Sequence, residues 1–168
     1  MEQVDKTRNL GIIMDGRLRF ESHVMNVAKC CFYRLKLLYK IRDLVTEDVR
    51  CKLCESLILS KFNYCDVVYG PCLLSTSKRV IRRVQNACCC FCFKIPPRSH
   101  VTPYMNKAGF LNMSTRRQLH LAGLLFNVIK YKKPQYLYNK LTWADSMHNT
   151  RCKGRILIMS FNVSAHRP

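Results

Sequence analysis

The chain has 168 residues, enough for one hydrophobic core, and this length predicts one domain. Of these residues 48% are apolar, which excludes a disordered basic tail because such tails cannot bury surface. The 29 Lys and Arg residues against 10 Asp and Glu give a net charge of +19, well above that of an ordinary small domain. Self-repulsion on this scale implies a polyanionic partner, for which nucleic acid is the first candidate.

The positive charge is concentrated in the middle of the chain. Residues 1–66 carry 12 basic and 9 acidic side chains, a net charge of +3, whereas residues 67–144 carry 13 basic side chains and no acidic one. Surfaces without a binding role normally mix both signs. A field of one sign along this whole stretch favours contact with a nucleic-acid backbone, and a merely solvated basic surface is the alternative.

The eleven cysteines predict reduced thiols. Their number is odd and the first 25 residues contain no apolar signal-peptide core, so a secreted disulfide scaffold is not expected. No stretch approaches the roughly 18 apolar residues of a membrane span. We therefore expect an intracellular protein, cytoplasmic or nuclear, without a membrane partner and with several thiols packed as small apolar side chains.

The first residues predict a β-hairpin followed by a helix. Leu10–Met14 is a β-favouring apolar run, Asp15-Gly16 is a common tight turn, and residues 17–20 alternate between polar and apolar. These patterns predict two short strands joined at Asp15-Gly16. Ser22 then predicts the N-cap of a first helix. The apolar face of that helix consists of Val24, Val27, Ala28, Cys31, Leu35 and Leu38.

Two further helices are predicted before the prolines at 96 and 97. Thr46, followed by two acidic residues, predicts the start of a second helix that ends near residue 60. Residues 61–74 predict a short extended piece and a turn. A third helix begins near Ser75 or Ser77. Its predicted apolar face consists of Val80, Val84, Ala87, Cys88 and Phe91.

The remaining elements complete a mostly α fold. Thr102-Pro103 predicts the start of a short helix, and Pro134 predicts the start of a last short one. Between them, Ser114 is the predicted cap of a fifth helix. This helix is apolar nearly all round, so it is predicted to be central. Residues 155–161 suggest a short terminal strand. The predicted organisation is a β-hairpin over residues 1–21, about five or six helices over 22–144, and an irregular tail over 145–168.

Two helices carry basic strips away from their apolar faces. The strip on the third helix consists of Arg79, Arg82, Arg83 and Asn86, with no acidic residue nearby. The strip on the first helix consists of Lys29, Lys36, Lys40 and Tyr33, a pattern that suits phosphate contact and base stacking. For the first helix taken alone, an ordinary solvated face is the stronger interpretation.

No complete catalytic centre or metal site is expected. Cys51 and Cys54 have the spacing of two zinc ligands, but no second spaced pair answers them, so packed thiols are favoured. The five histidines fall in no nucleophile motif. The only adjacent acids, Glu47 and Asp48, are explained by a helix start, which leaves no carboxylate pair for two-metal catalysis. We therefore predict no independent enzyme activity, no metal and no cofactor.

Several segments between residues 9 and 160 form an ordered pattern. The matching segments are Asn9–Asp15, Leu18–Phe20, His23-Val24, Tyr64-Cys65, Val67–Gly70, Val84–Ala87, His100–Pro103, Arg116-Arg117 with His120, and Pro134–Leu137. Together they resemble the region after the catalytic core in reverse transcriptases of jockey-like non-long-terminal-repeat retrotransposons. Those enzymes are RNA-directed DNA polymerases that use magnesium. Their metal-binding aspartates lie upstream of this region, in an aromatic-x-Asp-Asp turn that this sequence does not contain.

The resemblance implies a function for the chain. Residues 10–20 would correspond to the strands after the palm, and the following helices to a thumb that grips the template-primer duplex through its backbone. We expect a truncated copy without its palm, an exposed apolar face where the palm would pack, and binding to RNA, DNA or their hybrid. The expected phosphate contacts are Arg79, Arg82 and Arg83, then Arg116, Arg117, Lys29, Lys36 and Lys40.

Two alternative hypotheses belong to other classes. The first is a helical protein-interaction or structural module whose basic face meets an acidic protein partner. The second is a retrotransposon remnant without a function.

Overall fold

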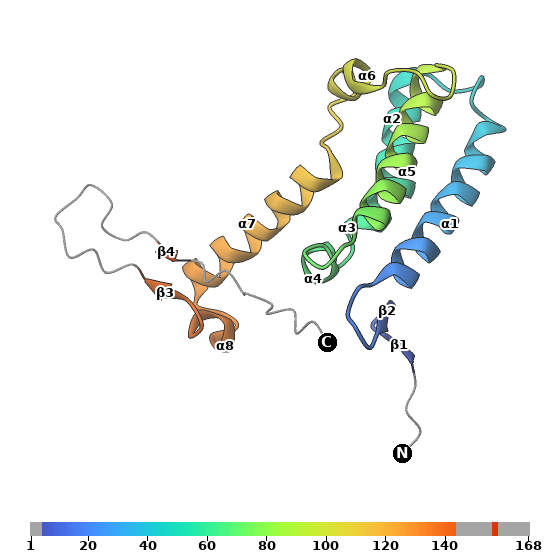
Figure 1. Ribbon diagram of the computed structural model, residues 1–168. Coiled ribbons are helices and arrows are strands. Elements are labelled where there is room, and N and C mark those ends of the chain that lie inside the picture. The colour runs from blue at the N-terminus through green and yellow to red at the C-terminus, as the bar shows by residue number, and fades with distance from the viewer. Residues whose placement is uncertain (1–4, 144–155, 158–168) are drawn as a thin grey trace. The chain divides into compact units, whose positions relative to one another are not determined.

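The computed structural model describes residues 5–143 and 156–157 (Figure 1). It confirms a mostly α fold that begins with a two-stranded antiparallel hairpin. The chain forms two compact units, Met1–His120 and Leu121–Pro168, so the division lies inside a helix. No helix in the described ranges is long and apolar enough to cross a membrane.

The hairpin pairs β1, Lys6–Asn9, with β2, Ile12–Asp15. Its turn residues, Leu10 and Gly11, both have positive φ angles of 46° and 84°, which suits the tight turns that join two-residue hairpins. A turn does follow at Asp15-Gly16, where the Leu18 N–H donates to the Asp15 carbonyl at 2.9 Å, but it joins no two strands, because residues 17–20 form no strand. The physical reason is that the Asp15 carboxylate accepts hydrogen bonds from the backbone ahead of it, which turns the chain toward the first helix.

Asp15 links the hairpin to the first helix and makes stability depend on pH. Its Oδ1 atom accepts hydrogen bonds from the backbone N–H groups of Phe20, at 3.0 Å, and Arg19, at 2.9 Å. The bond from Phe20 is the main cause that lowers the pKa of the Asp15 carboxyl. A carboxyl with a lowered folded pKa stabilises the fold above its unfolded pKa of about 3.9, and this stability is lost as the pH falls through the folded pKa.

We therefore expect Asp15→Asn to lower the unfolding free energy at pH 7, with a difference from the wild type that shrinks as the pH falls below about 4. Thermal unfolding followed by circular dichroism at several pH values measures this difference. Asp5→Asn is the matched control, because Asp5 is exposed and holds no hydrogen bond of this kind in the described region. Equal pH profiles for the two variants would contradict the role given to Asp15.

Helix α1 spans Glu21–Tyr39. The residue before it, Phe20, has a φ of 56°, so Ser22 lies inside the first turn and is not the predicted N-cap. The predicted apolar face is confirmed, since five of its six residues are buried and Val27 is half-buried. This face packs against α5, which spans Ser75–Phe93 (Figure 1).

The second predicted helix begins as expected after Thr46. Helix α2 spans Glu47–Cys54 and continues through a π-helical turn, η1, over Glu55–Leu59 and a short helix, α3, over Ser60–Asn63. The extra residue of a π turn shifts the side-chain register of a helix, so the faces before and after it are not in line. Together, α2, η1 and α3 extend to Asn63, slightly beyond the predicted end near residue 60.

The segment over residues 61–74, predicted as a short extended piece and a turn, has its turn at Pro71-Cys72 but is helical where the extended piece was expected. A short helix, α4, spans Asp66–Tyr69, and Cys65, with a φ of 53°, turns the chain into it. Phe62 and Tyr69 are both 2% exposed, and the Tyr69 hydroxyl donates a hydrogen bond to the Phe62 carbonyl. Burial of these two aromatic side chains, which local propensity does not record, explains the difference.

Helix α5 begins at Ser75, as predicted, but its buried face is rotated from the predicted one. Val84, Cys88 and Phe91 are buried as expected, whereas Val80 and Ala87 are only half-buried. The additional buried residues are Ser77, Ile81, Gln85, Cys89, Cys90 and Cys92. Contact with both α1 and α2 widens the buried face beyond the stripe that a single partner would cover.

The C-terminus of α5 is capped by side chains from elsewhere in the chain. Arg42 donates hydrogen bonds to the carbonyls of Cys90, at 2.9 Å, and Phe91, at 3.2 Å. Arg50, only 7% exposed, donates from Nε to the Cys92 carbonyl at 2.7 Å. A positive charge near the C-terminus of a helix is also stabilised by the negative end of the helix dipole. These two arginines therefore anchor α5 rather than contribute to a free basic surface.

The last helices differ from the prediction in position. Helix α6 spans Thr102–Lys107, with Val101 rather than Thr102 before its first turn. Helix α7 spans Met113–Tyr131, and the Asn112 side chain accepts the Ser114 N–H, so Ser114 is not the cap. Within the first unit, Leu119 of this helix is 55% exposed, whereas Met113 is 3% exposed. In the second unit, Val128 is 2% exposed. Because the residues of α7 are divided between the two units, its central position stays a prediction.

The end of the described chain contains short elements. Helix α8, Gln135–Tyr138, follows Pro134 as predicted. Strand β3, Thr142–Trp143, pairs with β4, Ile156–Leu157, antiparallel. The other residues of the predicted strand over 155–161, and the rest of the predicted tail, lie outside the described residues.

Candidate nucleic-acid interface

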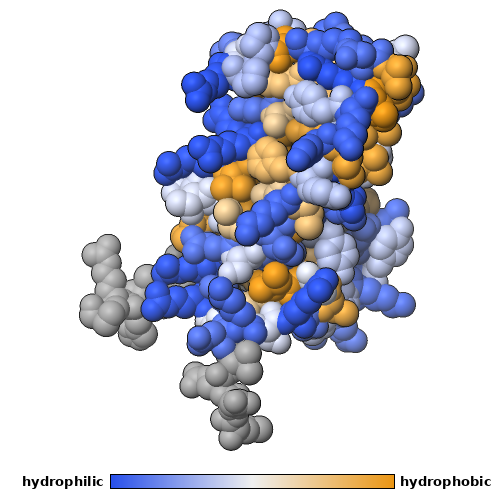
Figure 2. Space-filling view, turned by 90° about the vertical axis from the view of Figure 1, so that its right-hand side faces the viewer, coloured by the Kyte–Doolittle hydropathy of each residue, from blue (hydrophilic) through white to orange (hydrophobic). Residues whose placement is uncertain are grey.

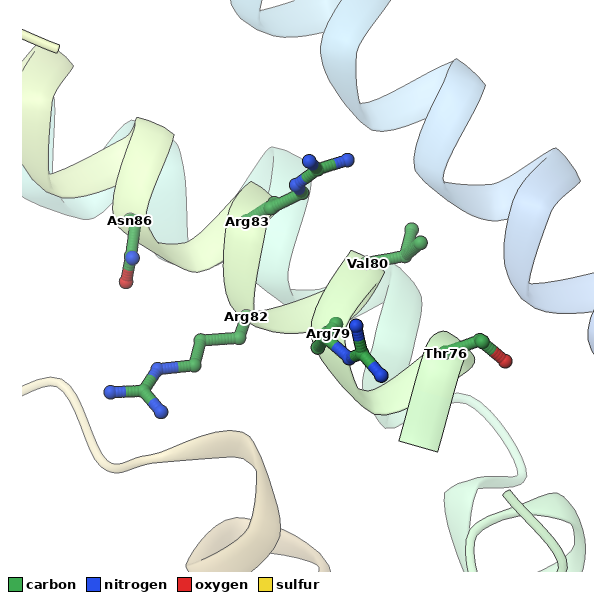
Figure 3. Close-up of a pocket in the computed structure, with 6 residues that line it drawn as sticks. All are labelled: Thr76, Arg79, Val80, Arg82, Arg83 and Asn86. Carbon is green, nitrogen blue, oxygen red and sulfur yellow. The ribbon is translucent and has the colours of Figure 1, made fainter. Parts of the chain in front are cut away.

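Helix α5 presents three arginines on the side away from the core. Arg79, Arg82 and Arg83 are all exposed, whereas Ile81 and Val84 between and beyond them are buried. The arginines line a shallow depression of about 400 Å³ (Figure 3). Among the described residues, the lining consists of Thr76, Arg79, Val80, Arg82, Arg83 and Asn86. The structure thus confirms that the predicted strip of Arg79, Arg82, Arg83 and Asn86 shares one surface, which we call the α5 basic face.

The charge of the α5 basic face is not neutralised by the described residues. Their four ion pairs are Lys94–Asp43, Lys107–Glu47, Arg116–Glu55 and His120–Asp66. None of these pairs includes an arginine of the α5 basic face. A guanidinium presents parallel N–H groups that match two oxygens of a phosphate, so this face has the donors that phosphate recognition requires.

The lysines of α1 form a separate strip. Lys29, Lys36 and Lys40 are exposed, and Tyr33 beside them is 65% exposed. None of the four lines the depression on α5. These lysines are therefore surface charges on α1 and are not part of the α5 basic face.

Apolar side chains also reach the surface of α1. Figure 2 shows apolar groups exposed among hydrophilic ones on one face of the molecule. On α1, the exposed fractions are 46% for Met25, 42% for Phe32 and 43% for Leu37. That a palm domain would pack on an exposed apolar face of this kind stays a prediction.

Arg116 does not have the exposure that a phosphate contact needs. The residue is 9% exposed, and its guanidinium pairs with both carboxylate oxygens of Glu55, with Nη2 3.0 Å from Oε2. This ion pair joins α7 to η1. Because its charge is already satisfied inside the protein, we remove Arg116 from the candidate phosphate-binding residues.

Arg117 and His120 lie beside α4. The Asp66 carboxylate, 2% exposed, lies 2.6 Å from Nδ1 of His120, and Nη1 of Arg117 lies 3.5 Å from the Gly70 carbonyl oxygen. A Cβ atom on Gly70 would overlap the Arg117 side chain and the Asp66 carbonyl oxygen. The glycine therefore lets Arg117 pass close to the backbone, and Arg117 remains half-buried with its charge unpaired in the described residues.

A second depression, of about 180 Å³, lies between α5 and the start of α7. We call it the α5–α7 pocket. Its lining consists of Lys78, Ile81, Arg82, Gln85, Asn112, Met113, Ser114 and Arg117. Sequence reasoning missed Lys78, although Lys78 and Arg82 are four residues apart and therefore neighbours on a helix. Only the fold shows that Arg117 joins them.

The cysteines are mainly core side chains. Cys54, Cys88 and Cys92 are fully buried at the contact of α2 with α5, and burial raises the pKa of the neighbouring Cys51 to about 12. A protonated thiol is a poor metal ligand and a poor nucleophile. In the part of the chain that the structure describes, no group of three or more His, Cys, Asp or Glu side chains is arranged to hold a metal ion.

Comparisons with protein-family models, curated proteins and solved structures find no match for this chain.

Proposed function

We propose that the chain binds nucleic acid through its phosphate backbone, at the α5 basic face, in the manner of a reverse-transcriptase thumb. The observation that carries the proposal is the set of three exposed arginines on one helix face, without a carboxylate partner among the described residues. The opposite side of the same helix is buried in the core, so the arginines project from a fixed element. Cations on a fixed backbone bind a polyanion with less loss of backbone freedom than cations on a mobile segment.

The spacing of the arginines suits a nucleic-acid strand. Arg79 and Arg83 are four residues apart, which is about 6 Å along a helix. One strand of duplex DNA places a phosphate about every 3.4 Å along its axis. The face can therefore contact two or three neighbouring phosphates, and such contacts position a duplex without reading its bases.

The resemblance to the post-palm region of retrotransposon reverse transcriptases supports the same proposal from the order of sequence segments. In that family the thumb holds the template-primer duplex through its backbone. The aromatic-x-Asp-Asp turn of the family does not occur in this sequence. The proposal therefore includes binding and no catalytic step.

A titration separates this proposal from the protein-interaction alternative. Labelled duplex DNA, RNA–DNA hybrid and single-stranded RNA are compared with polyglutamate of equal charge, by fluorescence anisotropy at several salt concentrations. We expect tighter binding to a duplex than to polyglutamate, and a linear fall of log affinity with log salt. Equal affinity for all four ligands would reduce the interaction to nonspecific charge, and tighter binding of polyglutamate would favour an acidic protein partner.

A further inference from the structure

We infer that the α5–α7 pocket is a discrete site for one phosphate group, separate from the extended contacts of the α5 basic face. The inference rests on the proposed function and deepens it, because the ligand is a phosphate of the bound nucleic acid. The pocket would add Lys78 and Arg117 to the residues that hold the backbone.

The charge of the pocket carries the inference. Lys78 and Arg82 line it from α5, and Arg117 lines it from α7. No carboxylate is among the lining residues, and none of these three cations belongs to an ion pair in the described ranges. Three cations around one depression repel one another, and an anion between them removes that repulsion.

The size and the neutral groups of the pocket fit a phosphate. A volume of about 180 Å³ exceeds the roughly 30 Å³ that one water molecule occupies in the liquid, so a phosphate and several waters can enter. Ser114 adds a hydroxyl and Asn112 an amide to the lining. Because the Asn112 Oδ1 atom already accepts the Ser114 N–H at 3.0 Å, the pocket depends on its side-chain cations rather than on that backbone group.

The side of the pocket formed by α7 and the loop before it is held in position. Gln85, 1% exposed, donates a hydrogen bond from Nε2 to the Leu111 carbonyl at 2.7 Å, which ties the loop before α7 to α5. Arg117 is confined on its other side by the backbone at Gly70. Arg117 is therefore already in place, and a donor in place loses little conformational entropy when the ligand binds.

Arg82 connects the two surfaces. It lines both depressions, and Figure 3 shows that Arg82 and Arg83 leave α5 in different directions. A strand that follows the α5 basic face can therefore place one phosphate against Arg82 and into the pocket. This arrangement would fix the register of the strand on the helix.

The test uses inorganic phosphate as the probe and Lys78→Gln as the lead variant. Lys52→Gln is the matched control, because Lys52 is exposed on α2 and lines neither depression. We expect the ³¹P signal of inorganic phosphate to broaden when the wild-type protein or the K52Q variant is added. In K78Q we expect about tenfold weaker phosphate binding, the scale of one charge-assisted hydrogen bond. Phosphate should also displace labelled duplex more effectively than chloride at equal ionic strength, except in K78Q.

The double variant R79Q/R83Q separates this inference from the proposed function. It should lose duplex affinity and keep the ³¹P response, because neither residue lines the pocket. An unchanged ³¹P signal with the wild type, together with equal duplex affinity of K78Q and K52Q, would overturn the pocket and leave the α5 basic face standing. A ³¹P response without duplex binding would overturn the proposed function and assign the pocket to free phosphate compounds.

Discussion

Replacement of Arg79, Arg82 and Arg83 together by glutamine is expected to weaken duplex binding by roughly 100-fold at low salt. Each exposed contact contributes about 1 kcal/mol, and a total of about 3 kcal/mol corresponds to this factor. Three lost phosphate contacts should also reduce the slope of log affinity against log salt by about 2.7, since each neutralised phosphate contributes about 0.9. Anisotropy titrations of one duplex over a range of salt concentrations measure both quantities.

The chain offers a control with the same change of charge. Replacing Lys29, Lys36 and Lys40 by glutamine also removes three positive charges, but from the strip on α1 that lies outside the depression. All six side chains are exposed, so neither variant should change thermal stability by more than about 0.5 kcal/mol per residue. If the two triple variants lose the same affinity and the same salt slope, binding follows net charge and the placement on α5 is wrong.

Arg50→Met is expected to lower the unfolding free energy by about 3 kcal/mol. The Arg50 guanidinium donates hydrogen bonds to the carbonyls of Cys92, at 2.7 Å, Val45, at 2.6 Å, and Arg42, at 3.2 Å. Methionine keeps much of the side-chain volume but leaves these carbonyls without their donor, and a buried polar group without a partner costs about 1–3 kcal/mol. Urea denaturation at pH 7 measures the change.

Arg34→Met is the matched control for this prediction. Its guanidinium makes one described hydrogen bond, from Nη1 to the Leu57 carbonyl at 3.0 Å, in an exposed setting where water can replace it. We expect a loss below about 1 kcal/mol for that variant. Arg50→Lys should be nearly as destabilising as Arg50→Met, because one ammonium group cannot span the same carbonyls. Similar losses for R50M and R34M would show that Arg50 does not anchor the end of α5.

Local sequence patterns were sufficient for several helix starts and for the basic face. Helices α2, α5 and α8 begin where Thr46, Ser75 and Pro134 predict, because a start depends on residues within one turn. The arginines of α5 share one face because their spacing follows the helical period. The predicted fold class, mostly α with an N-terminal β-hairpin, is also confirmed, because it too follows from local patterns.

Local patterns were insufficient where distant residues decide the conformation. The hairpin turn lies at Leu10-Gly11 because the Asp15 side chain is engaged with the chain that follows it. Residues 61–63 and 66–69 are helical rather than extended because Phe62 and Tyr69 are buried against other elements.

Arg116 and Arg117 illustrate the difference most clearly. Composition and residue spacing by themselves determined that this chain is basic and mostly helical, and they treated the two neighbouring arginines as equivalent. Consecutive residues on a helix point about 100° apart. Only the tertiary structure placed Arg116 against Glu55 and Arg117 in the α5–α7 pocket, because the partner that neutralises one charge and spares the other lies about sixty residues away in the chain.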